Sequence, residues 1–194
     1  MLPDPEGRDQ LEAAMNRSAT SALIVFGGLP GTGKTTISRE LTVRLAATYL
    51  RIDAIEQTLR DAGLIVGAAG YAVANALAAE NLKLGRIVIA DCVNPVLASR
   101  VAWRQTASQS SACMVEIEVV CSEPAVHRQR VESRSPDIDG LNLPSSDEVV
   151  SRPYQPWDRE HLVLDTAEST LDHLLDRAEA HVRERIGKSL IGVW

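Results

Sequence analysis

The feature that most constrains this chain is a glycine-rich segment, GLPGTGKT, at residues 28–35. An apolar run at residues 21–27 precedes it, and such a run is typical of a buried strand. After it, apolar side chains recur at helical spacing, at Ile37, Leu41 and Leu45. The segment therefore joins a buried strand to a helix. In that setting it matches the Walker A pattern of phosphate-binding loops in full.

Elementary chemistry explains the spacing of this pattern. Glycines let the backbone curl tightly and turn successive N–H groups toward an anion, and the helix that follows adds the positive end of its dipole. Lys34 can reach the β and γ phosphates of ATP, and the hydroxyl of Thr35 can ligate Mg²⁺. We therefore predict ATP and Mg²⁺ as cofactors. The predicted nucleotide contacts are Gly28, Pro30, Gly31, Thr32, Gly33, Lys34, Thr35 and Thr36.

Apolar runs alternate with helical patterns along the rest of the chain. We expect strands at residues 21–27, 48–52, 86–90, 112–120 and 161–164, with helices between them. This alternation predicts a three-layer α/β fold, the P-loop NTPase fold, with a five-stranded parallel sheet and helices on both faces. The domain is expected to cover residues 21–194, and residues 1–20 are expected to form a leader in front of it.

Two aspartates follow predicted strands. Ligands of a parallel α/β sheet bind beyond the carboxyl ends of its strands, and Asp53 and Asp91 end the second and third strands. Asp53 can orient an acceptor hydroxyl and accept its proton. Asp91 stands where a Walker B aspartate would, so it either holds Mg²⁺ through water or grips the acceptor. For both, a plain helix cap is the alternative. Glu56, one turn after Asp53, lies either on the same face or in solvent.

Two later helices have clear sequence signals. Asn94 and Pro95 suit an N-cap and a first helical position, which predicts a helix from there to about Thr106. The last helix has an apolar face, which predicts packing against the core. The side chains on that face are Leu171, Leu174, Leu175, Ala178 and Val182.

Residues 123–152 are expected to form a small helical lid. A helix begins at residues 122–124, and residues 135–144 are rich in Ser, Pro, Asp and Gly, as is typical of a mobile loop. Arg130 and Arg134 are four residues apart and are expected to share a helix face. A guanidinium matches the charge of a transferring phosphoryl group, and a mobile lid excludes water. These two arginines are therefore the candidate catalytic residues of the lid.

The alternative for these arginines is a solvated basic face that pairs with Glu132 and nearby acids. Arg128 is expected to point to another side of the helix, and Arg152 is a further candidate beyond the loop. Tyr154 and Trp157 lie among prolines, where packing explains them more simply than a role in walling the nucleotide pocket.

Composition narrows the class of partner. The net charge is −6, which disfavours a protein built to wrap nucleic acid. The apolar runs are too short to span a bilayer and the first 20 residues lack an apolar signal segment, so we expect a cytoplasmic protein without membrane contact. Cys92, Cys113 and Cys121 are expected to be buried free thiols, and no zinc site is expected because the four histidines show no metal-ligand spacing with them.

Several of these segments together resemble the predicted-kinase branch of the P-loop kinases. They are GLPGTGKTT at residues 28–36, RID at residues 51–53, ADCVNP at residues 90–95 and the arginine-bearing helix at residues 128–134. That branch is similar to the kinase domain of polynucleotide kinases, to zeta toxins and to adenylylsulfate kinases, and the resemblance covers about residues 21–167. It implies phosphate and Mg²⁺ contacts for Lys34 and Thr35, an acceptor-activating role for Asp53, and a lid role for Arg130 or Arg134.

One position departs from this family pattern. Polynucleotide and adenylylsulfate kinases usually have an arginine three positions after the aspartate that matches Asp53, where it meets an anionic acceptor. This chain has Glu56 there. The departure points to a neutral or cationic hydroxyl compound, such as a sugar, a nucleoside or an aminoglycoside-like molecule.

The sequence thus predicts an ATP-dependent kinase, a phosphotransferase with an alcohol group of a small molecule as acceptor. A nucleic-acid 5′-end kinase is one alternative, which the net charge and Glu56 disfavour. A P-loop NTPase switch without an acceptor is another. GTPases read guanine through an Asn-Lys-x-Asp segment, which the sequence lacks, and an Asp-x-x-Gly match at residues 137–140 falls in the predicted lid loop instead of at a strand end.

Overall fold

The structure is a computed structural model that describes residues 21–191, so the expected leader at residues 1–20 lies outside the described residues. In this part of the chain, five strands form one sheet in the order β2-β3-β1-β4-β5, and every neighbouring pair is parallel. The strands are β1 (Ala22–Gly27), β2 (Thr48–Arg51), β3 (Ile87–Asp91), β4 (Cys113–Val120) and β5 (Leu162–Asp165). The predicted five-stranded parallel sheet is confirmed.

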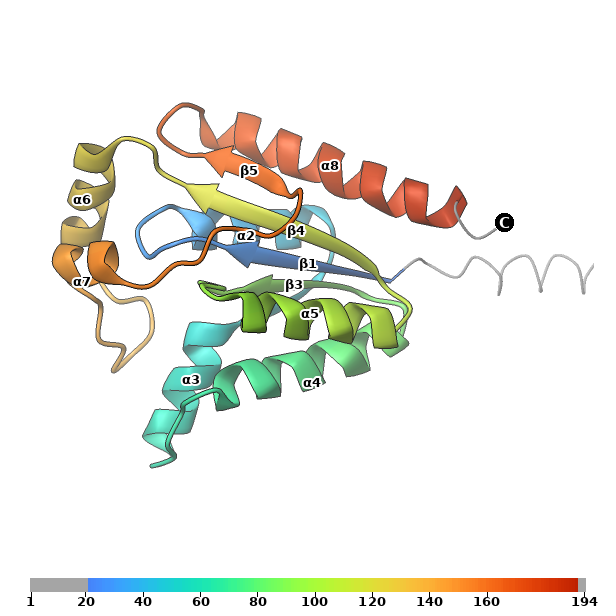
Figure 1. Cartoon of the computed structure of the whole chain (residues 1–194), viewed down its shortest axis with the longest axis horizontal. Helices are drawn as coiled ribbons and strands as arrows, with labels where there is room; N and C mark the ends of the chain where they lie inside the picture. Colours follow the sequence, from blue (N-terminus) through green and yellow to red (C-terminus); the bar gives the residue numbers. More distant parts are fainter. Residues whose placement is uncertain (1–20, 192–194) are drawn as a thin grey trace, which may run out of the picture.

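Helices cover both faces of this sheet, as Figure 1 shows. α2 and α8 lie on one face, and α4 and α5 lie on the other. α6 and α7 sit together beyond the carboxyl end of the sheet. The helices are α2 (Lys34–Arg44), α3 (Ile52–Asp61), α4 (Ala69–Lys83), α5 (Leu97–Gln109), α6 (Pro124–Ser133), α7 (Ser146–Ser151) and α8 (Leu171–Ile191). Among these helices, none is long and apolar enough to cross a membrane.

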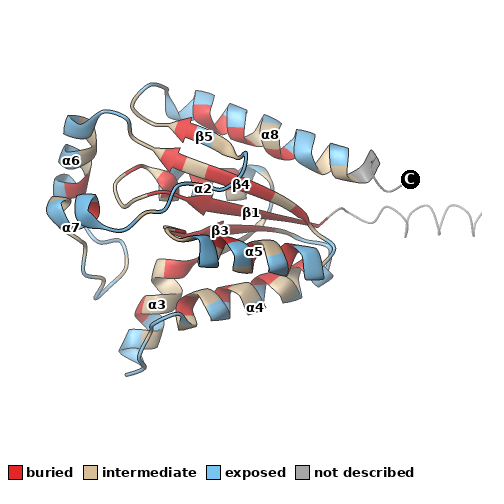
Figure 2. Cartoon of the chain, viewed as in Figure 1, coloured by how far each residue is buried: buried red, intermediate tan, exposed pale blue. Residues whose placement is uncertain are grey.

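The central strand β1 explains why the fold forms around the phosphate-binding segment. All of its residues are buried, because helices pack on both of its faces. Ile24 and Phe26 face the core beneath α2 and α8, and Leu23 and Val25 face the core beneath α4 and α5. Figure 2 shows the contrast with α6 and α7, which carry mostly exposed or half-buried residues. The glycine-rich segment therefore leaves a rigid strand, whereas the lid is thinly packed.

Two predicted boundaries were wrong at the carboxyl end of the sheet. β2 ends at Arg51, and Asp53 lies in the first turn of α3 instead of at the end of the strand. Asn94 is no N-cap, because α5 begins only at Leu97. The backbone of Asn94 is left-handed (φ 51°), and its carbonyl accepts a hydrogen bond from Nε of the buried Arg100. This contact holds the chain in a turn before the helix starts.

The lid and the last helix also differ from their predictions. α6 ends at Ser133, and Arg134 is extended, so Arg130 and Arg134 do not share a helix face. α7 was not predicted; a capping box in which Ser145 and Glu148 bond each other's backbone N–H begins it. In α8, Leu171 is exposed, while the four other predicted core residues of that helix are buried.

All three cysteines are free thiols. Cys92 and Cys113 are buried as expected, whereas Cys121 is only half-buried. Cys121 directly follows the last residue of β4.

Candidate active site

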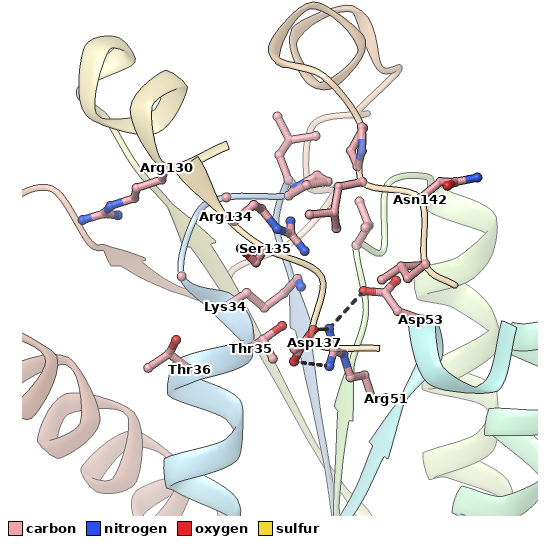
Figure 3. Close-up of a pocket in the computed structure, with 18 of the residues that line it drawn as sticks. Lys34, Thr35, Thr36, Arg51, Asp53, Arg130, Arg134, Ser135, Asp137 and Asn142 are labelled. Carbon is pink, nitrogen blue, oxygen red and sulfur yellow. Dashed lines mark hydrogen bonds and ion pairs between the residues drawn. The ribbon is translucent and has the colours of Figure 1, made fainter. Parts of the chain in front are cut away.

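A cleft of about 450 Å³ opens at the carboxyl ends of the strands. The phosphate-binding segment forms one wall, α3 forms the opposite wall, and the lid loop at residues 135–144 covers it (Figure 3). Among the described residues, seven basic and three acidic side chains line this cleft. The site is therefore basic within a chain of net charge −6, which suits a polyanionic ligand such as a nucleotide.

The backbone of the phosphate-binding segment has the conformation that its glycines predict. Gly28, Gly31 and Gly33 have φ values of 137°, 87° and 89°, which side-chain-bearing residues rarely adopt. Space is also restricted, because a Cβ on Gly28 would lie 2.2 Å from the carbonyl oxygen of Val119, and one on Gly31 would lie 2.5 Å from Cγ2 of Val131. The close approach of β4 and α6 thus requires glycine at both positions.

The predicted nucleotide contacts divide into two groups. Six of them line the cleft: Pro30, Gly31, Gly33, Lys34, Thr35 and Thr36. Gly28 and Thr32 do not, and they act on the shape of the loop instead. Thr32 Oγ1 donates to the carbonyl of Leu29 (3.0 Å), and the carbonyl of Thr32 accepts from Thr166 Oγ1 (2.9 Å).

Lys34 and Asp91 form an ion pair at the base of the cleft. Nζ of Lys34 lies 3.0 Å from Oδ1 of Asp91, and the hydroxyl of Tyr49 donates to Oδ2 of Asp91 over 2.7 Å. Burial alone would lower the pKa of Lys34 and raise that of Asp91. The mutual attraction, with the further carboxylate of Asp53 acting on Lys34, outweighs burial, so the pKa of Lys34 is raised and that of Asp91 is lowered. Both groups are therefore charged.

The residues predicted for Mg²⁺ supply suitable donors. Thr35 lines the cleft, and its hydroxyl is among the groups that lower the pKa of the neighbouring Asp91 against the effect of burial. A hydroxyl and a carboxylate are oxygen ligands of the kind that Mg²⁺ takes, with phosphates and water completing its shell. Within residues 21–191, no cluster of three or more His, Cys, Asp or Glu side chains is placed to hold a metal ion by itself. The donor set fits a metal ion that arrives with the nucleotide.

Asp53 points into the cleft from α3, opposite the phosphate-binding segment (Figure 3). Its side chain is 37 % exposed, and Oδ2 lies 3.9 Å from Nη2 of Arg51. Glu56 lies one turn further along α3 and also lines the cleft, as the first of its two predicted placements stated. Glu56 Oε2 accepts from Nη2 of Arg60 (3.1 Å), and its stem packs on Gly70, where a Cβ would lie 2.4 Å from Cγ of Glu56. Burial raises the pKa of Glu56, and Arg60 opposes the rise.

The two candidate lid arginines have different surroundings. Arg134 projects over the cleft near Lys34, whereas Arg130 points away from Lys34, as Figure 3 shows. Nη1 and Nη2 of Arg130 donate to Oγ1 and the carbonyl of Thr166, over 2.6 and 3.1 Å. Arg128 is 68 % exposed and pairs with Glu132 (2.8 Å), which is the solvated arrangement that the alternative described. Arg152 lines the cleft.

Sequence reasoning missed a cluster that closes the far side of the cleft. Asp137, in the lid loop, accepts two hydrogen bonds from Arg51 (2.7 and 2.8 Å) and pairs with Arg39 (2.9 Å). Arg51 could have been noticed from the sequence, because it is a charged residue near the end of a short predicted strand. No local pattern connects Arg39 on α2 with a loop about 100 residues later.

Tyr154 and Trp157 stabilise the segment that follows the lid. The guanidinium of Arg100 lies 4.3 Å from the ring centroid of Trp157 and 5.4 Å from that of Tyr154, and it donates to the carbonyls of Gln155 and Pro156. Neither aromatic ring lines the cleft. Packing against α5 is therefore their role, as the simpler explanation stated.

Comparison with known proteins agrees with this geometry. The family model described as AAA domain matches residues 23–152. An uncharacterized protein of Mycobacterium tuberculosis is 29 % identical over an alignment of 168 residues that covers 77 % of this chain and 32 % of that protein, and its Mycobacterium bovis counterpart matches equally. The chain thus spans about a third of the length of these relatives.

Three solved structures share the fold. Kti12 of Chaetomium thermophilum, in complex with ADP-AlF3, has a TM-score of 0.65 and 21 % identity, with 84 % of this chain and 98 % of that chain covered. A gluconokinase of Sinorhizobium meliloti has a TM-score of 0.63 and 15 % identity, with 89 % and 98 % covered. APS kinase CysC of Mycobacterium tuberculosis, in complex with AMPPNP and APS, has a TM-score of 0.61 and 16 % identity, with 84 % and 98 % covered.

Proposed function

Because this chain belongs to the AAA domain family and has a P-loop kinase-like fold, we propose that it transfers the γ-phosphate of ATP to a hydroxyl group of a small molecule, with Mg²⁺ as the metal ion. The observation that carries this proposal is the carboxylate of Asp53, which shares one cleft with Lys34 and the phosphate-binding segment. A nucleotide-dependent switch has no acceptor and needs no carboxylate at that place. A kinase needs one to orient the hydroxyl and take its proton.

The proposed reaction gives each side chain a task. Lys34 leaves its ion pair with Asp91 and binds the β and γ phosphates of ATP. Asp53 accepts the proton of the acceptor hydroxyl as the oxygen of that hydroxyl bonds to the γ phosphorus. The bond from the γ phosphorus to the β-phosphate oxygen breaks, and ADP leaves. Arg134 donates to the oxygens of the transferring group. Thr35 and Asp91 would hold Mg²⁺, which would neutralise phosphate charge.

The charges around Asp53 support an acceptor without a large net charge. Two carboxylates, Asp53 and Glu56, line this end of the cleft together with Arg60 and Arg152. Arg60 already neutralises Glu56 through the 3.1 Å pair. A polycation would have to displace Arg60, and a strongly anionic group would meet two carboxylates. A neutral hydroxyl compound such as a sugar or nucleoside is the acceptor class that we propose.

A panel assay tests this function. The protein is incubated with Mg·ATP and neutral sugars, polyols and nucleosides, with amino sugars and sugar phosphates as charged counterparts and a 5′-hydroxyl oligonucleotide as a polymer. ADP release above the rate without acceptor, lost in Asp53→Asn, is the expected result for a neutral compound. Turnover of the oligonucleotide alone would establish an end kinase instead, and ADP release that no acceptor changes would favour the switch.

A further inference from the structure

The lid loop is fastened to the end of β2 and to α2 through one carboxylate. Asp137 lies about a third of the way along the segment that joins α6 to α7, and it bridges guanidinium groups from two elements. Nη1 and Nη2 of Arg51, at the end of β2, donate to its two oxygens over 2.7 and 2.8 Å. Nη2 of Arg39, on α2, lies 2.9 Å away. Dashed lines in Figure 3 mark the two bonds from Arg51 to Asp137, and a further dashed line marks its ion pair with Asp53.

Arg51 depends on this contact. Its side chain is only 6 % exposed, and a buried charge is costly unless a partner compensates it. Its other carboxylate neighbour, Asp53, is 3.9 Å away, and its Nε has no hydrogen-bond partner among the described residues. Asp137 is therefore the main group that compensates a guanidinium fixed beside the proposed catalytic carboxylate.

The rest of the loop covers the cleft on the same side. Arg134 and Ser135 line the cleft just before Asp137, and the segment from Leu141 to Pro144 lines it just after. Between them, Gly140 has a left-handed backbone (φ 75°) and approaches α3 so closely that a Cβ there would lie 3.0 Å from Nε2 of Gln57. The position of this covering segment thus depends on the contacts that its middle makes with β2, α2 and α3.

We propose that Asp137 is a positioning residue that latches the lid loop onto Arg51 and Arg39, and that this latch sets Arg134 over Lys34 during phosphoryl transfer. The hydrogen bonds from Arg51 also hold the pKa of the Asp137 carboxyl at about 2, so the latch stays charged throughout the neutral range. The effect on turnover rests on the proposed function. The effect on the loop does not.

Limited proteolysis tests the latch without any acceptor. Trypsin cleaves after Lys and Arg; Arg134 is the only such residue between Val131 and Ser151, and Arg152 is protected by the proline that follows it. Mass spectrometry of native protein reports the rate at which the bond after Arg134 is cut. We expect Asp137→Ala to raise this cleavage rate about tenfold, because the charge-assisted hydrogen bonds to Arg51 are lost. Arg39→Gln should raise it about two- to fivefold, because only the more exposed ion pair with Asp137 is lost.

Asp139→Ala is the matched control. It lies two residues from Asp137 in the same loop, does not line the cleft, and makes no ion pair within the described residues, so its cleavage rate should equal that of the wild type. Equal rates for the wild type and Asp137→Ala would overturn the latch, and so would an equal increase in Asp139→Ala. If Asp137→Ala does not fold, Arg39→Gln, whose side chain is half exposed, carries the same comparison alone.

Turnover completes the test. With an acceptor from the panel, or with water as acceptor in ATP hydrolysis, Asp137→Ala should lower kcat about tenfold while the Kd for ATP stays within about twofold, because the latch acts on the transition state through Arg134. Faster cleavage with unchanged kcat would refute the positioning role. If no acceptor is phosphorylated even by the wild type while Asp137→Ala is cleaved faster, the latch stands and the proposed function falls.

Discussion

The two walls of the cleft are held in shape by different kinds of interaction. The wall at residues 28–36 is one continuous segment, and backbone conformation gives it its shape, with left-handed glycines pressed against β4 and α6. The facing wall is assembled from α3, the end of β2 and the lid loop, and ion pairs between side chains hold it together. A backbone cradle suits a constant ligand, the phosphates of a nucleotide. A wall of side chains can be altered one residue at a time, which suits the variable acceptor.

Burial separates the walls as well. Lys34 and Asp91 are almost completely buried, whereas Asp53 is 37 % and Asp137 is 40 % exposed. The buried pair of Lys34 and Asp91 is therefore coupled tightly to folding, as is the buried Arg51 of the second wall, whereas the partly exposed carboxylate of Asp53 can be changed with little loss of stability. Substitutions on each wall should reveal this difference, and four predictions follow in order of expected effect.

Lys34→Ala should have the largest effect. The variant loses the cation for the β and γ phosphates, so we expect transfer to fall by about 10³-fold or more and ATP binding to weaken. It also leaves the buried carboxylate of Asp91 unpaired, which should lower the free energy of unfolding by about 3–5 kcal/mol. Calorimetric titration with Mg·ATP and thermal unfolding measure both.

The double variant Lys34→Ala/Asp91→Asn separates these two losses. It removes the unpaired charge, so part of the stability should return while transfer stays lost. If Lys34→Ala bound and turned over ATP like the wild type, the phosphate-binding segment would not be the nucleotide site.

Asp53→Asn should fold like the wild type but lose most of its phosphoryl-transfer activity. The amide has the shape of the carboxylate but cannot accept a proton, so turnover should fall by about 10²–10⁴-fold while ATP affinity changes little. The melting temperature should stay within a few degrees, because the side chain is partly exposed. Asp61→Asn, on the same helix but outside the cleft, is the control. A well-folded Asp53→Asn protein with full turnover would move the search for the base to Asp91.

Arg134→Ala and Arg130→Ala should differ in their effects, although the sequence alone does not distinguish the two arginines. Arg134 projects over the cleft near Lys34, so its loss should lower kcat by about 10²–10³-fold with little change in ATP affinity. Arg130 is bound to Thr166, which in turn contacts the carbonyl of Thr32. Arg130→Ala should therefore lower stability and nucleotide affinity while kcat changes less than in Arg134→Ala. The reverse ranking of kcat would make Arg130 the catalytic arginine.

The comparison of walls also explains what the sequence could predict. The strand, the glycine-rich turn and the helix of the first wall are contiguous, so local spacing predicted the fold and placed Lys34 and Thr35 in the cleft. Asp53 was found through the rule for parallel sheets, although β2 ends two residues before it. These predictions depend on short-range pattern and on topology.

The contacts of the second wall could not be predicted from the sequence in the same way. The pairing of Asp137 with Arg39 and Arg51 spans 98 and 86 positions of the chain, and no periodicity encodes it. The expected helix face with Arg130 and Arg134 failed because α6 ends between them. The expected N-cap at Asn94 failed because Asn94 lies in a left-handed turn before α5, where its carbonyl accepts from Arg100 six residues later. Of these features, the pairing of Asp137 is the one that contacts between distant segments decided.

Tyr49→Phe should have the smallest effect. It tests whether the hydroxyl of Tyr49, on β2, orients the carboxylate of Asp91 behind the phosphate-binding segment. The hydroxyl of Tyr49 fixes Oδ2 of Asp91 over 2.7 Å, while Lys34 holds Oδ1. When Lys34 turns to the phosphates, Tyr49 is left as the group that orients this carboxylate toward Mg²⁺. Loss of one hydrogen bond to a charged group should weaken the Mg²⁺ dependence of ATP binding by about tenfold, with binding of metal-free ATP unchanged.

Titration of ATP binding against Mg²⁺ measures this effect, and Tyr154→Phe is the control because its hydroxyl accepts from Trp157 outside the cleft. Burial and the adjacent carboxylate of Asp91 raise the pKa of Tyr49, so the phenol remains a donor and the difference between the variants should not change between pH 6 and pH 9, a range well below about 10, the ordinary pKa of tyrosine. An equal Mg²⁺ dependence in Tyr49→Phe and the wild type would show that Asp91 is held by the surrounding strand packing alone. The first wall would then end at Asp91, and β2 would contribute only Arg51 to the site.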